Sequence, residues 1–256
     1  MSLQAANSGL RSLPFSQAAP YIAERVQRAV QERGRCDLVL AGGRTPSRVY
    51  EQLAGSRVPW QRVRLFWGDE RFVPTDHEAS NYRMVRETLL ERASPPARNV
   101  FPVRTGAVSP AEAALEYERT LRGLFPGHAF PAFDLVLLGL GADGHTASLF
   151  PGGPECEERS RWCVASLAPE GTAVRERVTL TLPVLNAART VAFLVAGEEK
   201  RGALQALVGA AESGLPAQRV RAARSGLHVA GSELRVARSG LHVAGELLCF
   251  TDLRVG

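Results

Sequence analysis

Short apolar runs alternate along this chain with segments whose apolar residues recur at helical spacing. An unbroken apolar run of four to eight residues is typical of a strand covered on both faces. Runs of β type that alternate with helices predict an α/β fold, here a Rossmann-like, doubly wound, mostly parallel sheet flanked by helices. The expected strands are 36–41, 62–67, 133–139, 162–167, 177–182, 190–196 and 247–252, and the expected helices include 17–33, 47–54, 80–91 and 110–121.

The chain contains no segment rich in proline or serine that could serve as a linker, so a single domain over residues 1–256 is expected. One irregularity lies near the end. The nine residues ARSGLHVAG occur at 223–231 and again at 237–245. Two short copies are too few for a solenoid, so residues 219–245 are interpreted as containing a local tandem duplication. Only one copy can occupy a given strand position.

A glycine-rich turn follows the first expected strand. Gly42 and Gly43 come directly after it, and Arg44, Thr45 and Pro46 lead into the next helical segment. Thr45 is a plausible N-cap, with Pro46 in the first helical position. Backbone N–H groups converge at such a turn, and the positive end of the helix dipole faces it, so the turn can hold a phosphate. Neither the P-loop lysine nor the GxGxxG spacing of a dinucleotide turn is present.

The strand at 133–139 opens the stretch FDLVLLGLGADGHTASLFPG, in which Asp143, Gly144 and His145 follow the apolar run. Two interpretations stay open from these residues alone. The glycines can shape a turn while Asp143 caps a following helix. Alternatively, His145 belongs to a ligand site, because open α/β folds bind ligands at the carboxyl ends of their strands.

Composition narrows the function classes. With 45% hydrophobic and 22% charged residues the chain resembles ordinary soluble proteins, and no apolar run approaches the roughly 20 residues that span a bilayer, so no membrane partner is expected. The first residues lack a secretory signal, which makes a cytoplasmic location the expectation. The net charge of +5 is spread without a basic tract, so no nucleic acid partner is expected. A monomer or weak homo-oligomer is expected.

Metal and disulfide chemistry are not expected. The four cysteines show neither a CxxC pair nor metal-ligand spacing, and buried free thiols are the favoured interpretation. A metal site of Asp69, His77 and His145 is weakly supported, because their spacing forms no recognised ligand set. Of the 31 basic residues, Lys200 alone is lysine. Chance can explain this, but a site that requires a compact ammonium rather than a guanidinium also can.

Three strand ends carry the segments LAGGRTP, WGDERFVP and GLGADGHTASLFPG, and elsewhere the chain contains SNYR, RVTLTLPVLNAAR and GEEKR. Together these segments resemble the 6-phosphogluconolactonase family, within the glucosamine-6-phosphate isomerase/6-phosphogluconolactonase superfamily. The resemblance covers roughly residues 15 to 252, and the duplication is its main departure. It implies hydrolysis of the small-molecule phosphosugar lactone 6-phospho-D-glucono-1,5-lactone to 6-phospho-D-gluconate in the oxidative pentose phosphate pathway, without metal or cofactor.

Lactone hydrolysis needs a general base and a site for the developing oxyanion. His145 is the best candidate base, since an imidazole is largely neutral at cellular pH, and Asp143 could orient it. The resemblance places Arg71 and Lys200 at the substrate phosphate and Asp69 in the same pocket. Glycines 42 and 43, Arg44 and Thr45 are the other expected substrate-binding residues, whereas Glu70 is expected to face solvent.

A covalent acyl-enzyme is disfavoured, because no GxSxG motif is present and Ser148 has no evident relay to a base. Two rival functions remain. A glucosamine-6-phosphate isomerase would need a carboxylate base, and its branch typically continues toward Asn-Glu-Pro where residues 146–151 here read TASLFP. A non-catalytic sugar-phosphate sensor would normally carry a DNA-binding segment, and no helix-turn-helix precedes residue 36.

Overall fold

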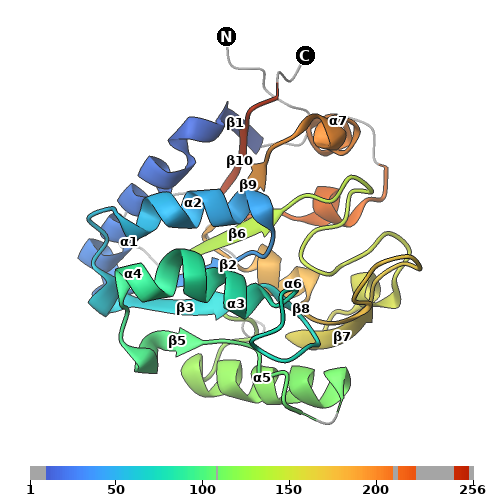
Figure 1. Ribbon diagram of the computed structural model, residues 1–256, viewed down its shortest axis with the longest axis horizontal. Coiled ribbons are helices and arrows are strands. Elements are labelled where there is room, and N and C mark those ends of the chain that lie inside the picture. Colours follow the sequence, from blue (N-terminus) through green and yellow to red (C-terminus); the bar gives the residue numbers. More distant parts are fainter. Residues whose placement is uncertain (1–9, 108, 210–212, 223–244, 254–256) are drawn as a thin grey trace, which may run out of the picture.

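The computed structural model describes residues 10–107, 109–209, 213–222 and 245–253. Within them, seven strands form a sheet in the order β1-β10-β9-β6-β2-β3-β5, and each neighbouring pair is parallel (Figure 1). The expected α/β fold with a parallel sheet flanked by helices is thereby confirmed. The strands are β1 (Leu10–Pro14), β2 (Cys36–Leu40), β3 (Val63–Trp67), β5 (Val100–Phe101), β6 (Leu135–Gly139), β9 (Thr190–Val195) and β10 (Glu246–Thr251).

Burial explains which strands the sequence pattern finds. Every residue of β2 and β9 is buried, as their continuous apolar runs predict. The edge strand β1 escapes prediction, because only Leu10 among its five residues is buried. The predicted final strand is confirmed as β10, between β1 and β9. The repeat lies outside the described residues except for Gly245, so the occupancy of a strand by either copy stays a prediction.

A second, antiparallel sheet corrects part of the prediction. Residues expected to add strands to a mostly parallel sheet instead form β7 (Cys163–Leu167) and β8 (Glu176–Leu180), which pair antiparallel with each other. On its other side β8 pairs antiparallel with β4 (Asp69–Arg71). Gly68 joins the two sheets. Its N–H donates to Leu40 O at the end of β2, and its carbonyl accepts from Leu180 N of β8. One continuous run from β3 into β4 therefore passes from the main sheet into the small one.

The helices follow their sequence signals closely. The predicted inner face of the first helix is buried at Ile22, Val26 and Ala29, and Gly34, at φ 74°, ends that helix in the left-handed conformation. Ser109 caps α5 by accepting a hydrogen bond from Glu112 N, as its capping box predicts. The helices are α1 (Ala18–Arg33), α2 (Arg44–Ala54), α3 (Asn81–Val85), α4 (Glu91–Ala93), α5 (Pro110–Leu124), α6 (Leu182–Asn186) and α7 (Arg201–Val208). Within the described part of the chain, none combines the length and apolarity needed to cross a bilayer.

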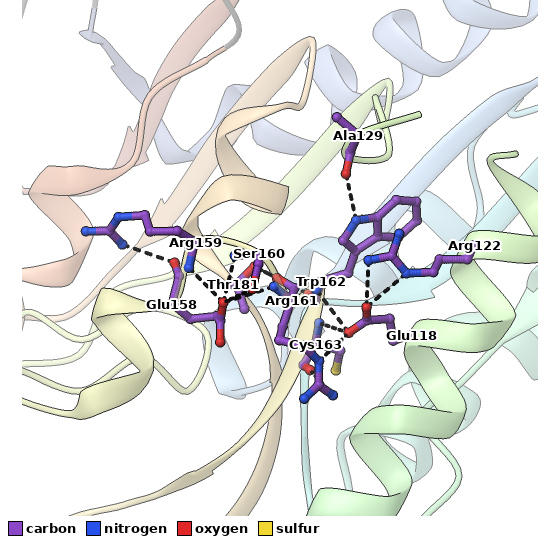
Figure 2. A network of polar contacts seen from close by, with 10 residues as sticks. All are labelled: Glu118, Arg122, Ala129, Glu158, Arg159, Ser160, Arg161, Trp162, Cys163 and Thr181. Atoms are coloured by element: carbon purple, nitrogen blue, oxygen red, sulfur yellow. Dashed lines mark hydrogen bonds and ion pairs between the residues drawn. The ribbon is translucent and has the colours of Figure 1, made fainter. Parts of the chain in front are cut away.

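Helix α5 is fastened to the small sheet through one carboxylate (Figures 1 and 2). Glu118, 7% exposed, accepts hydrogen bonds from the guanidinium groups of Arg122 and Arg161 and from the backbone N–H groups of Trp162 and Cys163. Arg122 also lies over the Trp162 ring, 4.4 Å from its centroid. Burial opposes ionisation of Glu118, but these donors outweigh it and lower the carboxyl pKa.

Candidate functional site

A pocket of about 550 Å³ opens at the carboxyl ends of the central strands. Its walls come from the segments that follow β2, β3, β6 and β9, with β4 and β8 of the small sheet on one side. This is where open α/β sheets bind ligands. The structure brings all nine residues proposed from the sequence into this pocket: Gly42, Gly43, Arg44, Thr45, Asp69, Arg71, Asp143, His145 and Lys200.

The glycine turn after β2 differs in one detail from its prediction. Helix α2 begins at Arg44, and Gly43, at φ 105°, is its N-cap, so the prediction of Thr45 as N-cap is wrong. Only glycine adopts such a backbone conformation readily, which explains the choice of residue. Gly42 is constrained by space instead, because a Cβ there would lie 2.0 Å from the side-chain oxygen of Asn81. The residues at the start of α2, a position where backbone N–H groups have no acceptor within the helix, line the pocket.

His145 is held by its neighbour in the turn. Its Nδ1 lies 2.6 Å from Asp143 Oδ1, which also accepts a hydrogen bond from the His145 backbone N–H. No helix follows this turn, so the interpretation of Asp143 as a helix cap is wrong. Burial opposes ionisation of Asp143, but the hydrogen bonds from His145 outweigh it and lower the pKa of that carboxyl. An ionised carboxylate can only accept hydrogen bonds, so the Nδ1 that faces it carries the hydrogen. In a neutral ring this leaves the lone pair of Nε2 available.

Packing fixes the orientation of the same ring. His145 lies against Phe150 with the ring centroids 4.8 Å apart, and about a third of its side chain is exposed. A Cβ at Gly141 would lie 2.0 Å from His145 Nδ1, so glycine makes room for the imidazole. Ala147, two residues on, has φ 48°, a left-handed conformation uncommon for alanine. The loop over residues 141–150 thus fixes the position of the imidazole by packing and by its backbone conformation.

Asp69 and Ser148 form a buried link between two loops. Ser148 Oγ donates to Asp69 Oδ2 at 2.6 Å, and Asn81 Nδ2 lies 3.4 Å from Asp69 Oδ1. The backbone N–H of Ser148 also donates to Thr179 of β8. The Ser148 hydroxyl is therefore directed to a carboxylate rather than to His145, an arrangement that the sequence did not reveal. The expectation that this serine is not a nucleophile stays a prediction.

Glu70 contradicts the expectation that it faces solvent. It is 1% exposed, and its carboxylate accepts hydrogen bonds from the backbone N–H groups of Arg71, Asn81 and Tyr82. Burial raises the pKa of this carboxyl to about 7, although the three donors act in the opposite direction. Glu70 therefore fastens the start of α3 to β4, on the side of the strand away from the pocket residues Asp69 and Arg71.

The cationic residues come from separate elements. Arg71 Nη1 donates to Ala79 O. Lys200 closes a 3₁₀ turn (Glu198–Lys200) immediately before α7, one residue earlier than the expected place in the first turn of its helix. Arg177 of β8 also lines the pocket, and sequence reasoning missed it. The sequence did contain a signal, because Arg177 is the first residue of the segment RVTLTLPVLNAAR that supports the family resemblance. That segment does not indicate whether the Arg177 side chain points into the pocket.

The weakly supported metal site is not assembled. His77 does not line the pocket, and its Nδ1 accepts a hydrogen bond from Ala79 N. In the described ranges, no three His, Cys, Asp or Glu side chains are grouped closely enough to hold a metal ion. All four cysteines are buried free thiols, as expected.

Comparison with known proteins assigns the family. The family model "Glucosamine-6-phosphate isomerases/6-phosphogluconolactonase" matches residues 13–229. The chain belongs to this family. Among curated proteins, it is 43% identical to a 6-phosphogluconolactonase of Synechocystis over 76% of this chain and 80% of the relative. It is 40% identical to 6-phosphogluconolactonase of the rat over 79% and 80% of the two chains.

Solved structures agree with this assignment. A 6-phosphogluconolactonase from Thermotoga maritima superposes with a TM-score of 0.77 at 32% identity, covering 95% of this chain and 98% of the other. One from Trypanosoma brucei gives 0.76 at 29% identity, with 95% of each chain covered. The resemblance stated from the motifs is thus confirmed, as are the enzyme class and the place of this chain among the 6-phosphogluconolactonases of the family.

Proposed function

We propose that this chain hydrolyses 6-phospho-D-glucono-1,5-lactone to 6-phospho-D-gluconate by direct attack of water, assisted by His145. The observation that supports it most strongly is the Asp143–His145 pair, whose Nε2 stays available, in one pocket with the cations Arg71 and Lys200. A base and an anion anchor in one pocket match a substrate with an ester carbonyl at one end and a phosphate at the other.

In the proposed reaction, His145 Nε2 removes a proton from water as the water oxygen attacks the lactone carbonyl carbon. Asp143 keeps the proton on Nδ1 and stabilises the imidazolium that forms. The carbonyl oxygen becomes an oxyanion, which the positive end of α2 at Gly43 and Arg44 favours. Collapse of the tetrahedral intermediate breaks the bond to the ring oxygen, which takes the proton from the imidazolium. The product is the open hydroxy acid.

The enzymatic proposal is tested with purified protein and freshly prepared 6-phosphogluconolactone, by coupling the product to 6-phosphogluconate dehydrogenase and following NADPH. We expect a rate far above that of spontaneous hydrolysis, proportional to protein concentration. Saturable binding of the phosphosugar without turnover would instead support a sensor. Conversion of glucosamine 6-phosphate to fructose 6-phosphate would support the isomerase. Cytoplasmic location and a monomeric or weakly associated state stay predictions.

Lys200→Ala is expected to raise KM for the phospholactone roughly 10–100-fold while kcat changes much less. The reason is that an anchor used equally in the ground and transition states contributes uniform binding. Steady-state kinetics measures the two constants separately. Arg201→Ala is the matched control, because it removes a cation at the next position that does not line the pocket. A loss confined to kcat would place Lys200 at the reacting carbonyl and contradict its assignment to the phosphate.

A further inference from the structure

Two arginines of the small sheet face the same pocket from adjacent strands. Arg71 of β4 and Arg177 of β8 are directly opposite each other in the antiparallel register, and both line the pocket. Side chains opposite each other on one face of such a pair have Cβ atoms about 5 Å apart. Like charges at this spacing are unfavourable unless an anion lies between or beside them.

Neither guanidinium has a carboxylate partner among the described residues. Arg64, whose side chain is mostly covered, does have one in Asp37, with a closest approach of 2.6 Å. The guanidinium of Arg177, a residue that is 7% exposed, makes a single hydrogen bond within the described structure, from Nε to Val174 O. Arg71 donates through Nη1 to a backbone carbonyl, while its Nε is buried without an acceptor. Most N–H groups of the two guanidiniums therefore have no acceptor among the described residues.

The nearby carboxylates compensate these charges only in part, and neither forms an ion pair with Arg71 or Arg177 in the described structure. Asp69 accepts from Ser148, and Glu70 accepts from backbone N–H groups. Burial and repulsion from Arg71 lower the pKa of Arg177, and the opposing charges of Asp69 and Glu70 do not fully offset this. The side chain is enclosed by protein yet borders the pocket, so a pocket ligand is the remaining source of negative charge.

We propose that Arg177 binds the substrate phosphate jointly with Arg71, and that this two-guanidinium site makes the pocket prefer phosphorylated over unphosphorylated lactones. The proposal rests on the lactonase function proposed above and adds a substrate-binding residue to it. The two planar guanidinium groups would each direct parallel N–H donors to the oxygens of the phosphate dianion, which a single arginine cannot do. Lys200, from the segment after β9, lines the same pocket and adds a point charge.

The test compares two substrates, the phospholactone and glucono-1,5-lactone, in Arg177→Met, Arg177→Lys and the control Arg175→Met. Arg175 is exposed, lies two residues away, and also donates to a backbone carbonyl, but it does not line the pocket. For Arg177→Met we expect KM for the phospholactone to rise about 10–100-fold, since hydrogen bonds to charged groups contribute about 1.5–3 kcal/mol each. The kcat/KM for gluconolactone should stay within about twofold. Arg177→Lys should be intermediate, and Arg175→Met should match the parent.

A purely structural role would lower activity on both substrates alike, and that result would overturn the proposal, as would an unchanged KM. Thermal unfolding with inorganic phosphate gives a second readout that needs no turnover. Phosphate should raise Tm of the parent chain and of Arg175→Met more than that of Arg177→Lys. The lysine variant is used here because it retains a positive charge and so keeps the test available if Arg177→Met does not fold. Equal shifts would contradict the site. If the parent hydrolyses no lactone but keeps an Arg177-dependent phosphate shift, the proposed function fails while the anion site stands.

Discussion

His145→Ala is expected to lower kcat for phospholactone hydrolysis by roughly 10²–10⁴-fold, the usual contribution of a positioned general base. The substitution removes the only imidazole that lines the pocket within the described residues and leaves the cationic residues in place. KM should therefore change little. Stopped-flow or coupled steady-state kinetics, corrected for spontaneous hydrolysis of the lactone, measures both constants.

Two further variants sharpen this experiment. His77→Ala removes an exposed imidazole outside the pocket, and its activity should equal that of the parent. Asp143→Asn preserves the size of the side chain but removes the charge that keeps hydrogen on Nδ1, so it should lower kcat while retaining substrate binding. Turnover that survives His145→Ala unchanged would discard the assignment of the base. Activity lost to the same extent in His77→Ala would show that the loss in His145→Ala is not specific to the pocket imidazole.

Glu118→Ala is expected to lower the free energy of unfolding by about 2–4 kcal/mol. A buried donor left without an acceptor costs about 1–3 kcal/mol, and two buried backbone N–H groups lose theirs, whereas the Arg122 and Arg161 side chains, 49% and 39% exposed, can be hydrated. Arg122, Arg161 and the backbone N–H groups of Trp162 and Cys163 would all lose their shared acceptor (Figure 2). Urea denaturation followed by circular dichroism measures the change.

The control for this substitution lies on the same helix. Glu116 has a side chain that is 44% exposed and 3.7 Å from Arg104, so Glu116→Ala should cost less than about 1 kcal/mol. Comparable losses in the two variants would show that Glu118 is no more than a surface charge. Glu118→Gln keeps an acceptor oxygen and should lie between the two.

The sequence predicted the central sheet well because burial on both faces leaves a strong signal. The runs at 36–41 and 190–196 became β2 and β9, in which every residue is buried. Strand β1 was missed because an edge strand buries little and so lacks an apolar run. The small sheet was misassigned for a different reason. Apolar runs report burial but not the direction of the neighbouring strand, so β7 and β8 could not be separated from the main sheet.

The residues of the pocket were predictable to the extent that they follow strand ends. Asp69, Arg71 and His145 do, and the structure places all three in the pocket, while their roles stay predictions. The prediction for Glu70 was wrong because successive side chains of β4 point to opposite sides, and the sequence does not show which side is buried. Here Asp69 and Glu70, on opposite sides of the strand, are both buried. Arg177 is the second residue of β8, a strand far along the chain, and only the pairing of β8 with β4 brings it beside Arg71.

The chain runs from β3 through Gly68 into β4 and so passes from the main sheet into the small one. The pocket between them therefore has two kinds of surface. The glycine-rich segments after β2 and β6 line one part of the pocket, whereas Asp69 and Arg71 of β4 and Arg177 of β8 line another. Directed-evolution libraries confined to the residues of β4 and β8 should therefore shift the choice of sugar acid while sparing the parallel scaffold. A side chain at Gly42 or Gly141 would instead collide with Asn81 or His145.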